Sequence, residues 1–306
     1  MDYELAIIGA GPAGYSAAIY AVRAGIKTIL FEQGDGGGRA VLSPKIENYA
    51  GFEAISGAEL MKKMKQHASK YADIHYFEEI KSITPSGKTF SIETTKGKYL
   101  VGAVLLCTGT EHKTLGILSE QEFQGKGVSY CATCDGFFFK GKKVAVIGGG
   151  NAALMEAIFL KQLGCTEVTV IHRREQLRAE TIYEKEARTK HVHFLLNKEI
   201  TAITGTDTVQ AIQMKDVATG ASSTLAVDGV FISIGETPQN SLAKHLGVHL
   251  DEHGYIMVDS QQRTNIKGVY AAGDITGGLR QVVTACAQGA VAALSSTEVL
   301  GKKYPY

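Results

Sequence analysis

Two cysteines separated by two residues are the most reactive pattern in this 306-residue chain. Cys131-Ala132-Thr133-Cys134 is followed directly by Asp135. Two intervening residues let the sulfurs meet in a small ring at the start of a helix, where the helix dipole favours a thiolate, the nucleophile of disulfide exchange. Asp135 can donate or accept the thiol proton. The spacing therefore predicts a redox-active dithiol.

A zinc half-site and a structural disulfide are the alternatives for this pair. Tetrahedral zinc needs a second close pair of ligands, and neither the nine histidines nor the three other cysteines supply that spacing. A structural disulfide requires an oxidising compartment. The acidic start, Met1-Asp2-Tyr3-Glu4, is unlike a secretion signal, so we expect a cytoplasmic protein.

Composition bears on the remaining classes of protein. The chain has 35 Gly and only 5 Pro without a Gly-X-Y period, which excludes collagen and Pro-rich disorder. Its 32 Lys and Arg are balanced by 31 Asp and Glu, so we expect no nucleic-acid partner. The sequence lacks an uninterrupted apolar run of about 18 residues, so we expect no membrane partner. Three cysteines in apolar, strand-edge or Ala-rich contexts are expected to pack in the core: Cys107, Cys165 and Cys286.

The glycines mark an internal repeat that must position this chemistry. Leu5–Gly14 resembles Val144–Ala153 at an offset of 139 residues. Gly9, Gly11 and the helix-ending Gly25 recur at the same offset as Gly148, Gly150 and Gly164. Each copy has the pattern of a strand, a Gly-x-Gly-x-x-Gly/Ala turn, a helix and a second strand, the latter at residues 28–31 and 167–171. The repeat predicts two βαβ units.

The spacing within each turn suits a dinucleotide. The first glycine permits the tight turn, the second lets the backbone approach a pyrophosphate, and the third position must be small so that the helix packs on the strand. The helix N-terminus then faces the anion. Because two matches occur, each between a predicted strand and a predicted helix, we favour nucleotide sites over glycines that serve turns alone.

The two copies differ where the second strand ends. The first ends at Glu32, whose carboxylate can accept hydrogen bonds from a ribose diol and would repel a 2′-phosphate, so this copy suits FAD or NAD. The second ends at His172-Arg173-Arg174, with Arg178 expected in the first turn of a following helix. Arginines at this position can clamp a 2′-phosphate, which indicates NADPH. The alternative is a solvated basic helix start.

Later apolar runs indicate how the domains are connected. Val104–Gly109 and Val230–Gly235 are expected to be buried strands near the close of each unit, and Val269–Asp274 another strand, followed by a helix over about 281–300. The last segment is too short for a third domain, so we expect it to complete the first. The predicted fold class is α/β, with two Rossmann-like three-layer nucleotide-binding domains. The NADPH domain, 115–243, is inserted into an FAD domain formed by 1–114 and 244–306.

The chain resembles the low-molecular-weight thioredoxin reductases, the FAD- and NADPH-dependent type. The matching stretches occur in the family's order and are Gly9–Gly14, Ile46–Tyr49, Cys131–Phe138, Gly148–Asn151, His172–Arg174 with Arg178–Glu180, and Gly273–Ile275 with Arg280–Gln281. The resemblance implies that NADPH reduces FAD, that FAD reduces the Cys131–Cys134 disulfide, and that the dithiol reduces thioredoxin or a glutaredoxin-like protein. It also implies a homodimer whose NADPH domain rotates between these steps, and we place the hinge near 115–116 and 237–240.

The resemblance further implies roles for single residues. Cys134 would lie against the flavin and receive electrons, Cys131 would attack the thioredoxin disulfide, and Asp135 would be the acid-base residue. The expected FAD contacts are Gly9, Gly11, Pro12, Ala13, Gly14, Glu32, Gln33, Gly38, Arg39, Asn48, Thr108, Gly109, Gly273, Asp274, Arg280 and Gln281. The expected NADPH contacts are Gly148, Gly150, Asn151, Ala152, His172, Arg173, Arg174, Arg178 and Gly235. No metal is expected.

Three positions depart from the family's pattern. Arg39 follows Gly36-Gly37-Gly38 where the family usually has Gln, and a cation near the flavin would raise its potential. Ala50 stands where a proline is common, and we expect a small effect. The end, Lys302-Lys303-Tyr304-Pro305-Tyr306, is either a frayed terminus or an aromatic tail that stacks near the flavin.

Other functions remain as alternatives. A reductase fed by ferredoxin or a deazaflavin typically lacks the basic cluster that this chain keeps from His172 to Arg178. The related ferredoxin–NADP reductases lack the cysteine pair. A flavin-binding redox sensor or interaction module would need neither the dithiol nor a phosphate clamp. Preference for NADH over NADPH would contradict the interpretation of the arginines.

Overall fold

The computed structural model describes residues 1–304, which form two compact units. Unit 1 contains Met1–Glu111 and the segment from Thr237 onward, and unit 2 contains His112–Glu236. The sequence placed these borders later, at residues 115 and 243. The difference arises because the two chain crossings pair as short strands, β7 (Thr110–His112) with β16 (Glu236–Pro238), and the division falls within this ribbon.

Unit 1 is built on a seven-stranded sheet. Four of its strands run parallel in the order β3-β2-β1-β6, and β17 pairs with β6 in the same direction. Beyond β6, β5 and then β4 continue the sheet, each antiparallel to its neighbour. The strands are β1 (Tyr3–Ile8), β2 (Thr28–Phe31), β3 (Asp73–His75), β4 (Ile80–Ser86), β5 (Thr89–Thr94), β6 (Lys98–Leu106) and β17 (Val269–Ala271). The helical segments are α1 (Pro12–Arg23), η1 (Gly38–Leu42), α2 (Gly57–Ala68), α7 (Ser241–His245), η3 (Asp274–Thr276) and α8 (Val282–Val299).

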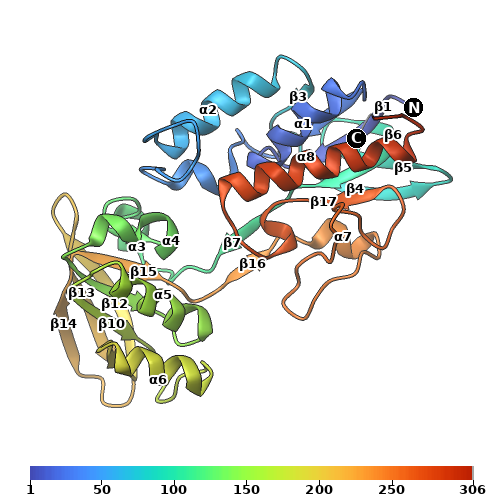
Figure 1. The fold of residues 1–306 in the computed structure, drawn as a ribbon. Coiled ribbons are helices and arrows are strands. Elements are labelled where there is room, and N and C mark those ends of the chain that lie inside the picture. Colours follow the sequence, from blue (N-terminus) through green and yellow to red (C-terminus); the bar gives the residue numbers. More distant parts are fainter. Residues whose placement is uncertain (305–306) are drawn as a thin grey trace. The chain divides into compact units, whose positions relative to one another are not determined.

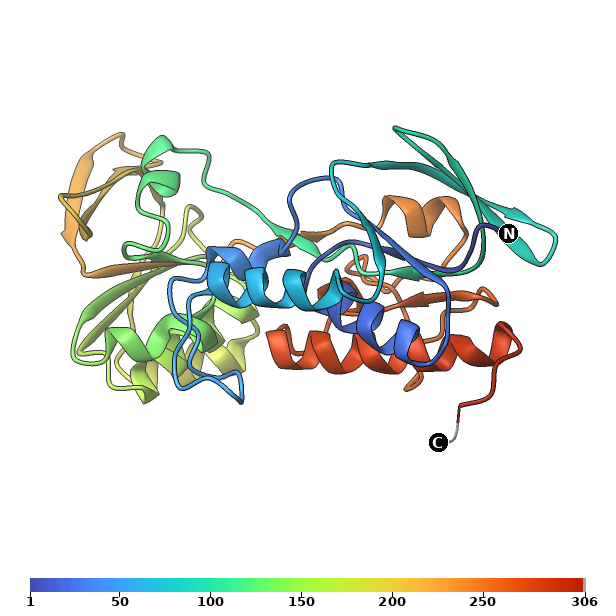
Figure 2. The ribbon, with the colours of Figure 1, turned by 90° about the horizontal axis from the view of Figure 1, so that it is seen from above.

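Both faces of this sheet are buried, as expected for a parallel sheet. Leu5 and Ile7 of β1 pack in a core with α1 and α8, whereas Ala6 and Ile8 point into a second core that includes α7. The helices α1 and α8 lie side by side (Figure 1, Figure 2), and Gly289 of α8 is so close to α1 that an added Cβ would lie 2.1 Å from the Ala13 carbonyl oxygen.

Unit 2 repeats this architecture on a five-stranded, all-parallel sheet in the order β11-β10-β9-β15-β8. A three-stranded antiparallel sheet, β12-β13-β14, covers one face and α5 and α6 cover the other. The strands are β8 (Val128–Ser129), β9 (Lys143–Ile147), β10 (Glu167–Ile171), β11 (His193–Leu195), β12 (Lys198–Gly205), β13 (Val209–Asp216), β14 (Ser222–Ala226) and β15 (Gly229–Ile232). The helical segments are α3 (Leu118–Glu122), α4 (Ala132–Asp135), η2 (Gly136–Phe139), α5 (Asn151–Gln162) and α6 (Thr181–Thr189).

The repeat read from the sequence is present in both units, and the α/β class is confirmed. The predicted second strands, 28–31 and 167–171, coincide with β2 and β10. The helices α1 and α5 each stop just before a glycine with positive φ, Gly25 at 75° and Gly164 at 93°, a conformation that side chains with a Cβ rarely adopt. The predicted final helix is α8, which begins after its N-cap residue, Gln281.

Within residues 1–304, one helix is long and apolar enough to cross a membrane by length and composition alone. It is α8, with a mean hydropathy of 1.2 over its 18 residues, of which 39% are buried inside the chain. Buried core helices pass the same test, and α8 packs against α1 in the unit 1 core. This helix is therefore weak support for a membrane span.

Candidate active site

The first glycine-rich turn connects β1 to α1 and leaves an open cradle. A Cβ on Gly9 would lie 2.3 Å from the Cys107 carbonyl oxygen, and one on Gly14 would lie 1.9 Å from the Gly9 carbonyl oxygen, so the fold itself requires both glycines. A Cβ on Gly11, by contrast, would meet no described atom within 4 Å. The fold does not require glycine there, but a ligand that approaches the backbone would.

The N-terminus of α1 opens at this cradle. Gly11 is its N-cap residue, Pro12 occupies the first turn, and no side chain in residues 1–304 caps it. The backbone N–H groups of the first turn therefore have no side-chain acceptor within these residues. Helix N-termini bind phosphate groups through such N–H groups and the helix dipole. Gly38 lies across the turn, where its Cβ would be 3.4 Å from the Gly11 Cα. The cradle fits a dinucleotide pyrophosphate.

Glu32 lies at the carboxyl end of β2, where a ribose would be bound. Its Oε2 accepts a 2.9 Å hydrogen bond from the Ala10 N–H and its Oε1 a 2.8 Å bond from the Gly34 N–H. A carboxylate has about four acceptor sites, so capacity remains for ribose hydroxyls. These backbone bonds fix the carboxylate beside the glycine-rich turn, while Gln33 is exposed.

The other expected FAD residues meet at the same edge of unit 1. The Asn48 amide donates a 3.0 Å bond to Gln281 Oε1, although the two residues are far apart in the sequence. Arg39 Nη1 lies 3.7 Å from Asp274 Oδ2, and it also bonds the Thr110 hydroxyl. The cation expected near the flavin is thus paired with an acid.

Four further FAD candidates contact neighbouring parts of unit 1. The Thr108 hydroxyl donates a 2.7 Å bond to the Gln239 carbonyl oxygen, and Gly109 accepts a 3.0 Å bond from the Gln239 N–H, which ties the outgoing and returning chain together. Arg280 donates a 3.0 Å bond to the Tyr255 hydroxyl. A Cβ on Gly273 would lie 3.0 Å from that of Ala13, so the end of β17 borders the start of α1.

The second glycine-rich turn connects β9 to α5 and has the same open position. A Cβ on Gly148 would lie 2.3 Å from the Ser233 carbonyl oxygen, whereas one on Gly150 would meet no described atom within 4 Å. The side chain of Asn151, at the start of α5, exchanges two hydrogen bonds with Glu180, at 2.7 and 2.8 Å. Ala152 is exposed in the first turn of α5, and Gly235 lies in the loop between β15 and β16 rather than at the end of the predicted strand.

The basic cluster follows β10 on a loop. Arg173, Arg174 and Arg178 are exposed, whereas His172 is buried against Gly149, whose Cβ would lie 2.4 Å from its Nδ1. Burial and the neighbouring arginines lower the pKa of His172, and its Nε2 has no hydrogen-bond partner in the described part of the chain.

The prediction that Arg178 starts a helix is wrong. Its N–H donates a 2.6 Å bond to the Gly149 carbonyl oxygen, and α6 begins only at Thr181. Because this bond returns the loop to the second glycine-rich turn, Arg178 lies beside the cradle rather than on a helix.

The cysteine pair follows β8. Because β8 and β9 run parallel in one sheet, the pair lies at the same carboxyl end of the strands as the second glycine-rich turn. Cys131 is the N-cap residue of α4 and forms a disulfide with Cys134, with Cα atoms 5.3 Å apart. Neither sulfur is therefore a metal ligand here, and residues 1–304 contain no group of three or more His, Cys, Asp or Glu that could hold a metal. Gly136 seats this helix on α5, because an added Cβ would lie 2.9 Å from Leu163.

The side chain of Asp135, the residue after the disulfide, is held by a residue that sequence reasoning missed. Ser129, the last residue of β8, donates a 2.6 Å bond to Asp135 Oδ2 and accepts a 3.1 Å bond from the Cys131 N–H. Burial raises the pKa of Asp135, and the bond from Ser129 opposes this shift only partly. Asp135 Oδ1 is buried without a partner among residues 1–304.

A buried acid holds the residue before Cys131. Glu120, 1% exposed, accepts a 2.7 Å bond from the Tyr130 hydroxyl and a 2.8 Å bond from the Leu115 N–H. The Tyr130 ring stacks on His112 of β7 with centroids 4.5 Å apart. The sequence signal for this link is a polar pair, Ser129-Tyr130, between a strand and the dithiol.

The other three cysteines are not equivalent. Cys107 and Cys165 are buried, and burial raises the pKa of both thiols, as expected for core residues. Cys286 is only half-buried, and its sulfur lies 4.0 Å from the Tyr49 hydroxyl. The expectation of a core role is thus only partly met at Cys286.

Residues 3–289 match the sequence family described as pyridine nucleotide-disulphide oxidoreductase. The thioredoxin reductase of Treponema pallidum is 43% identical over 295 residues, which cover 95% of each chain. That of Bacillus subtilis is 41% identical over 297 residues, covering 96% of this chain and 93% of that protein. The crystal structure of the thioredoxin reductase from Streptococcus pyogenes is 37% identical, with a TM-score of 0.94 and coverage of 98% of this chain and 99% of that chain. The chain therefore belongs to the pyridine nucleotide-disulphide oxidoreductase family and, within it, to the thioredoxin reductases.

Proposed function

We propose that this chain is an NADPH-dependent flavoprotein that reduces the disulfide of thioredoxin or a similar small protein. The observation that carries the proposal is the Cys131–Cys134 disulfide, which lies at the same sheet edge as an open pyrophosphate cradle and three exposed arginines. A disulfide accepts two electrons, which is what a nicotinamide delivers as hydride.

Unit 1 would hold FAD, which when bound carries two electrons from a nicotinamide to a disulfide. Gly11 and the N-terminus of α1 would bind the pyrophosphate, and Glu32 the ribose. Asn48, Asp274 and Gln281 would bind the rest of the cofactor. Support comes from the cradle that a Cβ on Gly11 would fill, and from the convergence of these residues at the carboxyl ends of β1, β2 and β17.

Unit 2 would bind NADPH as the electron-donating substrate. Gly150 and the N-terminus of α5 would bind its pyrophosphate, and the exposed guanidinium groups of Arg173, Arg174 and Arg178 its 2′-phosphate. Retention of this cluster supports NADPH over a ferredoxin or deazaflavin donor.

Once reduced, the dithiol would act by thiol–disulfide exchange. The Cys131 thiolate attacks one sulfur of the partner disulfide, which breaks that bond and forms a mixed disulfide. Cys134 then attacks the Cys131 sulfur, which restores the Cys131–Cys134 disulfide and releases the partner with both sulfurs reduced. Two protons are needed by the departing thiolates, and Asp135 would deliver one of them because burial raises its pKa.

The connection between the units would be the hinge for the rotation that the family requires. Both chain crossings lie in the β7–β16 ribbon, and Gly109 and Gly235, with φ of 67° and 102°, flank it. We therefore place the hinge a few residues before the positions first expected from the sequence.

We also infer a cytoplasmic homodimer. One face of α8 repeats apolar residues at helical spacing, and all of them are exposed or half-buried in the single chain: Val283, Ala287, Ala290, Val291 and Leu294. A second copy would cover this face. Light scattering should give twice the 32.7 kDa chain mass, and Val291→Glu should give the monomer mass.

Anaerobic stopped-flow absorbance tests the proposal. NADPH should bleach the oxidised yellow enzyme, and oxidised thioredoxin should then restore the colour. Failure of NADPH to bleach it would overturn the donor assignment. Bleaching without recovery upon addition of several thioredoxins would instead support the redox sensor.

A further inference from the structure

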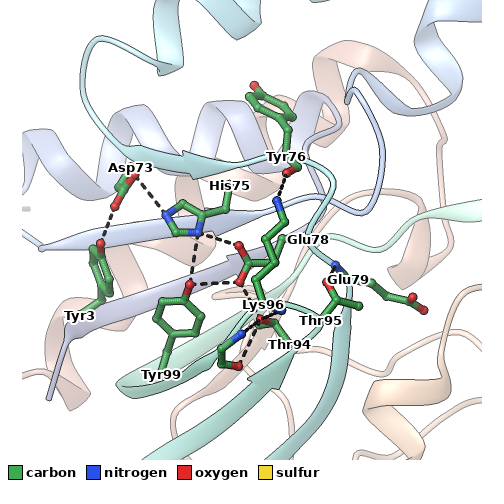
Figure 3. Close-up of polar contacts among 11 residues, drawn as sticks. Tyr3, Asp73, His75, Tyr76, Glu78, Glu79, Thr94, Thr95, Lys96 and Tyr99 are labelled. Atoms are coloured by element: carbon green, nitrogen blue, oxygen red, sulfur yellow. Dashed lines mark hydrogen bonds and ion pairs between the residues drawn. The ribbon is translucent and has the colours of Figure 1, made fainter.

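A cluster of polar and ionisable side chains lies on one face of the unit 1 sheet, outside the residues assigned above. Tyr3 of β1, Asp73 and His75 of β3, Glu78, Thr94 of β5 and Tyr99 of β6 contact one another there (Figure 3). Glu78 is the centre of this cluster, which we call the Glu78 hub, and its side chain is 3% exposed.

The hub satisfies both oxygens of a buried carboxylate. Oε1 accepts a 2.6 Å bond from the Thr94 hydroxyl and a 3.0 Å bond from the Tyr99 hydroxyl, and Oε2 lies 2.9 Å from His75 Nδ1. Burial alone would raise the pKa of Glu78, but these bonds outweigh it and lower the pKa. The ionised form is therefore built into the fold.

The hub closes a turn at residues 75–78 that the backbone alone would not favour. Phe77, at the centre of the turn, is 64% exposed and has a φ of 53°, which is unusual for an aromatic residue. Such a conformation persists only where the surroundings enforce it. The contact between His75 and Glu78 spans the turn, and the Lys96 ammonium bonds the Tyr76 carbonyl oxygen from outside at 3.1 Å.

The opposite side of this turn carries the end of β2. The Glu32 N–H donates to the His75 carbonyl oxygen and the Glu78 N–H donates to the Glu32 carbonyl oxygen, both at 2.9 Å. The Phe77 N–H donates to the Gly34 carbonyl oxygen at 3.2 Å. The backbone of Glu32 is thus bonded on both sides to the turn that Glu78 holds.

We propose that Glu78 is a positioning residue for the cofactor, because its hub fixes the turn that holds Glu32 in place for the adenosine ribose of FAD. This inference rests on the proposed assignment of FAD to unit 1. The His75 and Tyr99 rings also contact Phe31, the last residue of β2, with centroids 5.6 and 5.0 Å away. Both the backbone and the packing therefore connect the hub to the strand end.

FAD affinity of the apoprotein tests the proposal, measured by flavin fluorescence during titration. Glu78→Gln should weaken FAD binding by about tenfold, the cost of disturbing one charged hydrogen-bonded contact. Glu79→Gln is the matched control, because Glu79 is exposed and its side chain points away from the hub (Figure 3), and it should leave the affinity unchanged. If Glu78→Gln does not fold, Tyr99→Phe removes one donor and keeps the ring, and a loss of at least threefold is expected.

A double-mutant cycle distinguishes positioning from general destabilisation. In a Glu32→Gln background the further loss from Glu78→Gln, or from Tyr99→Phe, should shrink to less than twofold, because both changes act on the same ribose contact. An undiminished loss in that background, or wild-type affinity of the hub variant, would overturn the inference. An unmodified chain that binds no FAD would instead overturn the proposed function.

Discussion

Unit 1 and unit 2 begin with the same strand–turn–helix motif and differ where the second strand ends. In both, a strand leads through a turn to a 12-residue helix, and the middle glycine, Gly11 or Gly150, faces open space. After β2 comes a carboxylate, Glu32, fixed by two backbone N–H groups. After β10 come exposed arginines. In the proposed function, the backbone of each turn would bind a pyrophosphate, and the side chains at the end of the second strand would select the nucleotide.

The units also differ in the side chains at the carboxyl ends of their parallel strands. In unit 2 the edge strand β8 leads directly into the Cys131–Cys134 disulfide, with Asp135 held by Ser129. In unit 1 the corresponding edge carries side chains expected to hold FAD, among them the Arg39–Asp274 pair. The exchange chemistry therefore belongs to unit 2, and the following predictions test this division.

The largest effect is expected from the disulfide. Cys131→Ser and Cys134→Ser should each lower thioredoxin reduction on the order of 10⁴-fold, because removal of one member of a reacting pair abolishes the whole sequence of steps. Cys286→Ser is the control, since this half-buried thiol lies in unit 1 and forms no disulfide. Steady-state assays would measure the loss, and the account fails if either serine variant keeps a tenth of the wild-type rate.

Asp135→Asn should slow thioredoxin reduction by about 10²-fold, the usual contribution of a general acid. Single-turnover reoxidation of the reduced enzyme measures this step. Glu122→Gln changes an exposed acid of the same unit and should not alter the rate. An unchanged rate in Asp135→Asn would remove Asp135 from the mechanism.

The same substitution should stabilise the fold at neutral pH. Because burial raises the pKa of Asp135, the folded chain binds more protons than the unfolded chain between the ordinary and the raised value, and stability falls as pH rises through that window. Asp135→Asn removes this loss. Urea unfolding should show the variant more stable than wild type at pH 8, with the difference shrinking as pH falls through that window and absent below the ordinary pKa of an aspartate.

The glycine-rich turn of unit 1 predicts opposite effects on fold stability and FAD binding for substitutions at two of its glycines. Gly11→Ala should keep the fold intact, since the added Cβ meets no described atom within 4 Å, but should weaken FAD binding about tenfold by blocking the pyrophosphate. Gly14→Ala should destabilise the fold by at least about 2 kcal/mol, because its Cβ would overlap the Gly9 carbonyl oxygen. Equal effects of the two on unfolding would contradict this assignment.

The smallest effect is expected at Arg39. Arg39→Gln should lower the flavin potential, because a nearby cation stabilises the reduced, anionic flavin. The shift should stay below about 20 mV, since a partly exposed charge contributes about 1 kcal/mol or less and 30 mV corresponds to about 1.4 kcal/mol for two electrons. The pairing with Asp274 weakens the effect further. A potential equal to wild type in a dye-coupled titration would refute the role.

The fold was predictable because its signals are local. The second strands could be read to the residue, since β-branched runs and a glycine stop mark them. The Arg178 segment was misread, because a bond from its N–H to the Gly149 carbonyl oxygen holds it as a loop, and no local pattern reports such a contact. The borders between the units were displaced for the same reason, since β7 and β16 are strands only because they pair.

The candidate site was predictable in its reactive groups but not in their support. Cys131, Cys134 and Asp135 form one motif, whereas Ser129 is recognisable only once its hydroxyl is seen between Asp135 and the Cys131 N–H. Glu120 and Glu78 look like ordinary helix and loop acids in the sequence, although both are buried in the fold. The C-terminal aromatic tail extends to residues 305–306, which lie outside the described residues, so that prediction stands untested.

The nucleotide preference of unit 2 tests the central claim most directly. The claim is that side chains at the strand end, and not the shared turn, select the nucleotide. The ratio of kcat/KM for NADPH to that for NADH should fall at least tenfold in Arg173→Gln/Arg174→Gln, through a loss for NADPH alone. Lys185→Gln, an exposed charge change on α6, should leave the ratio unchanged. A wild-type enzyme that prefers NADH, or a double variant that loses both substrates equally, would contradict the account.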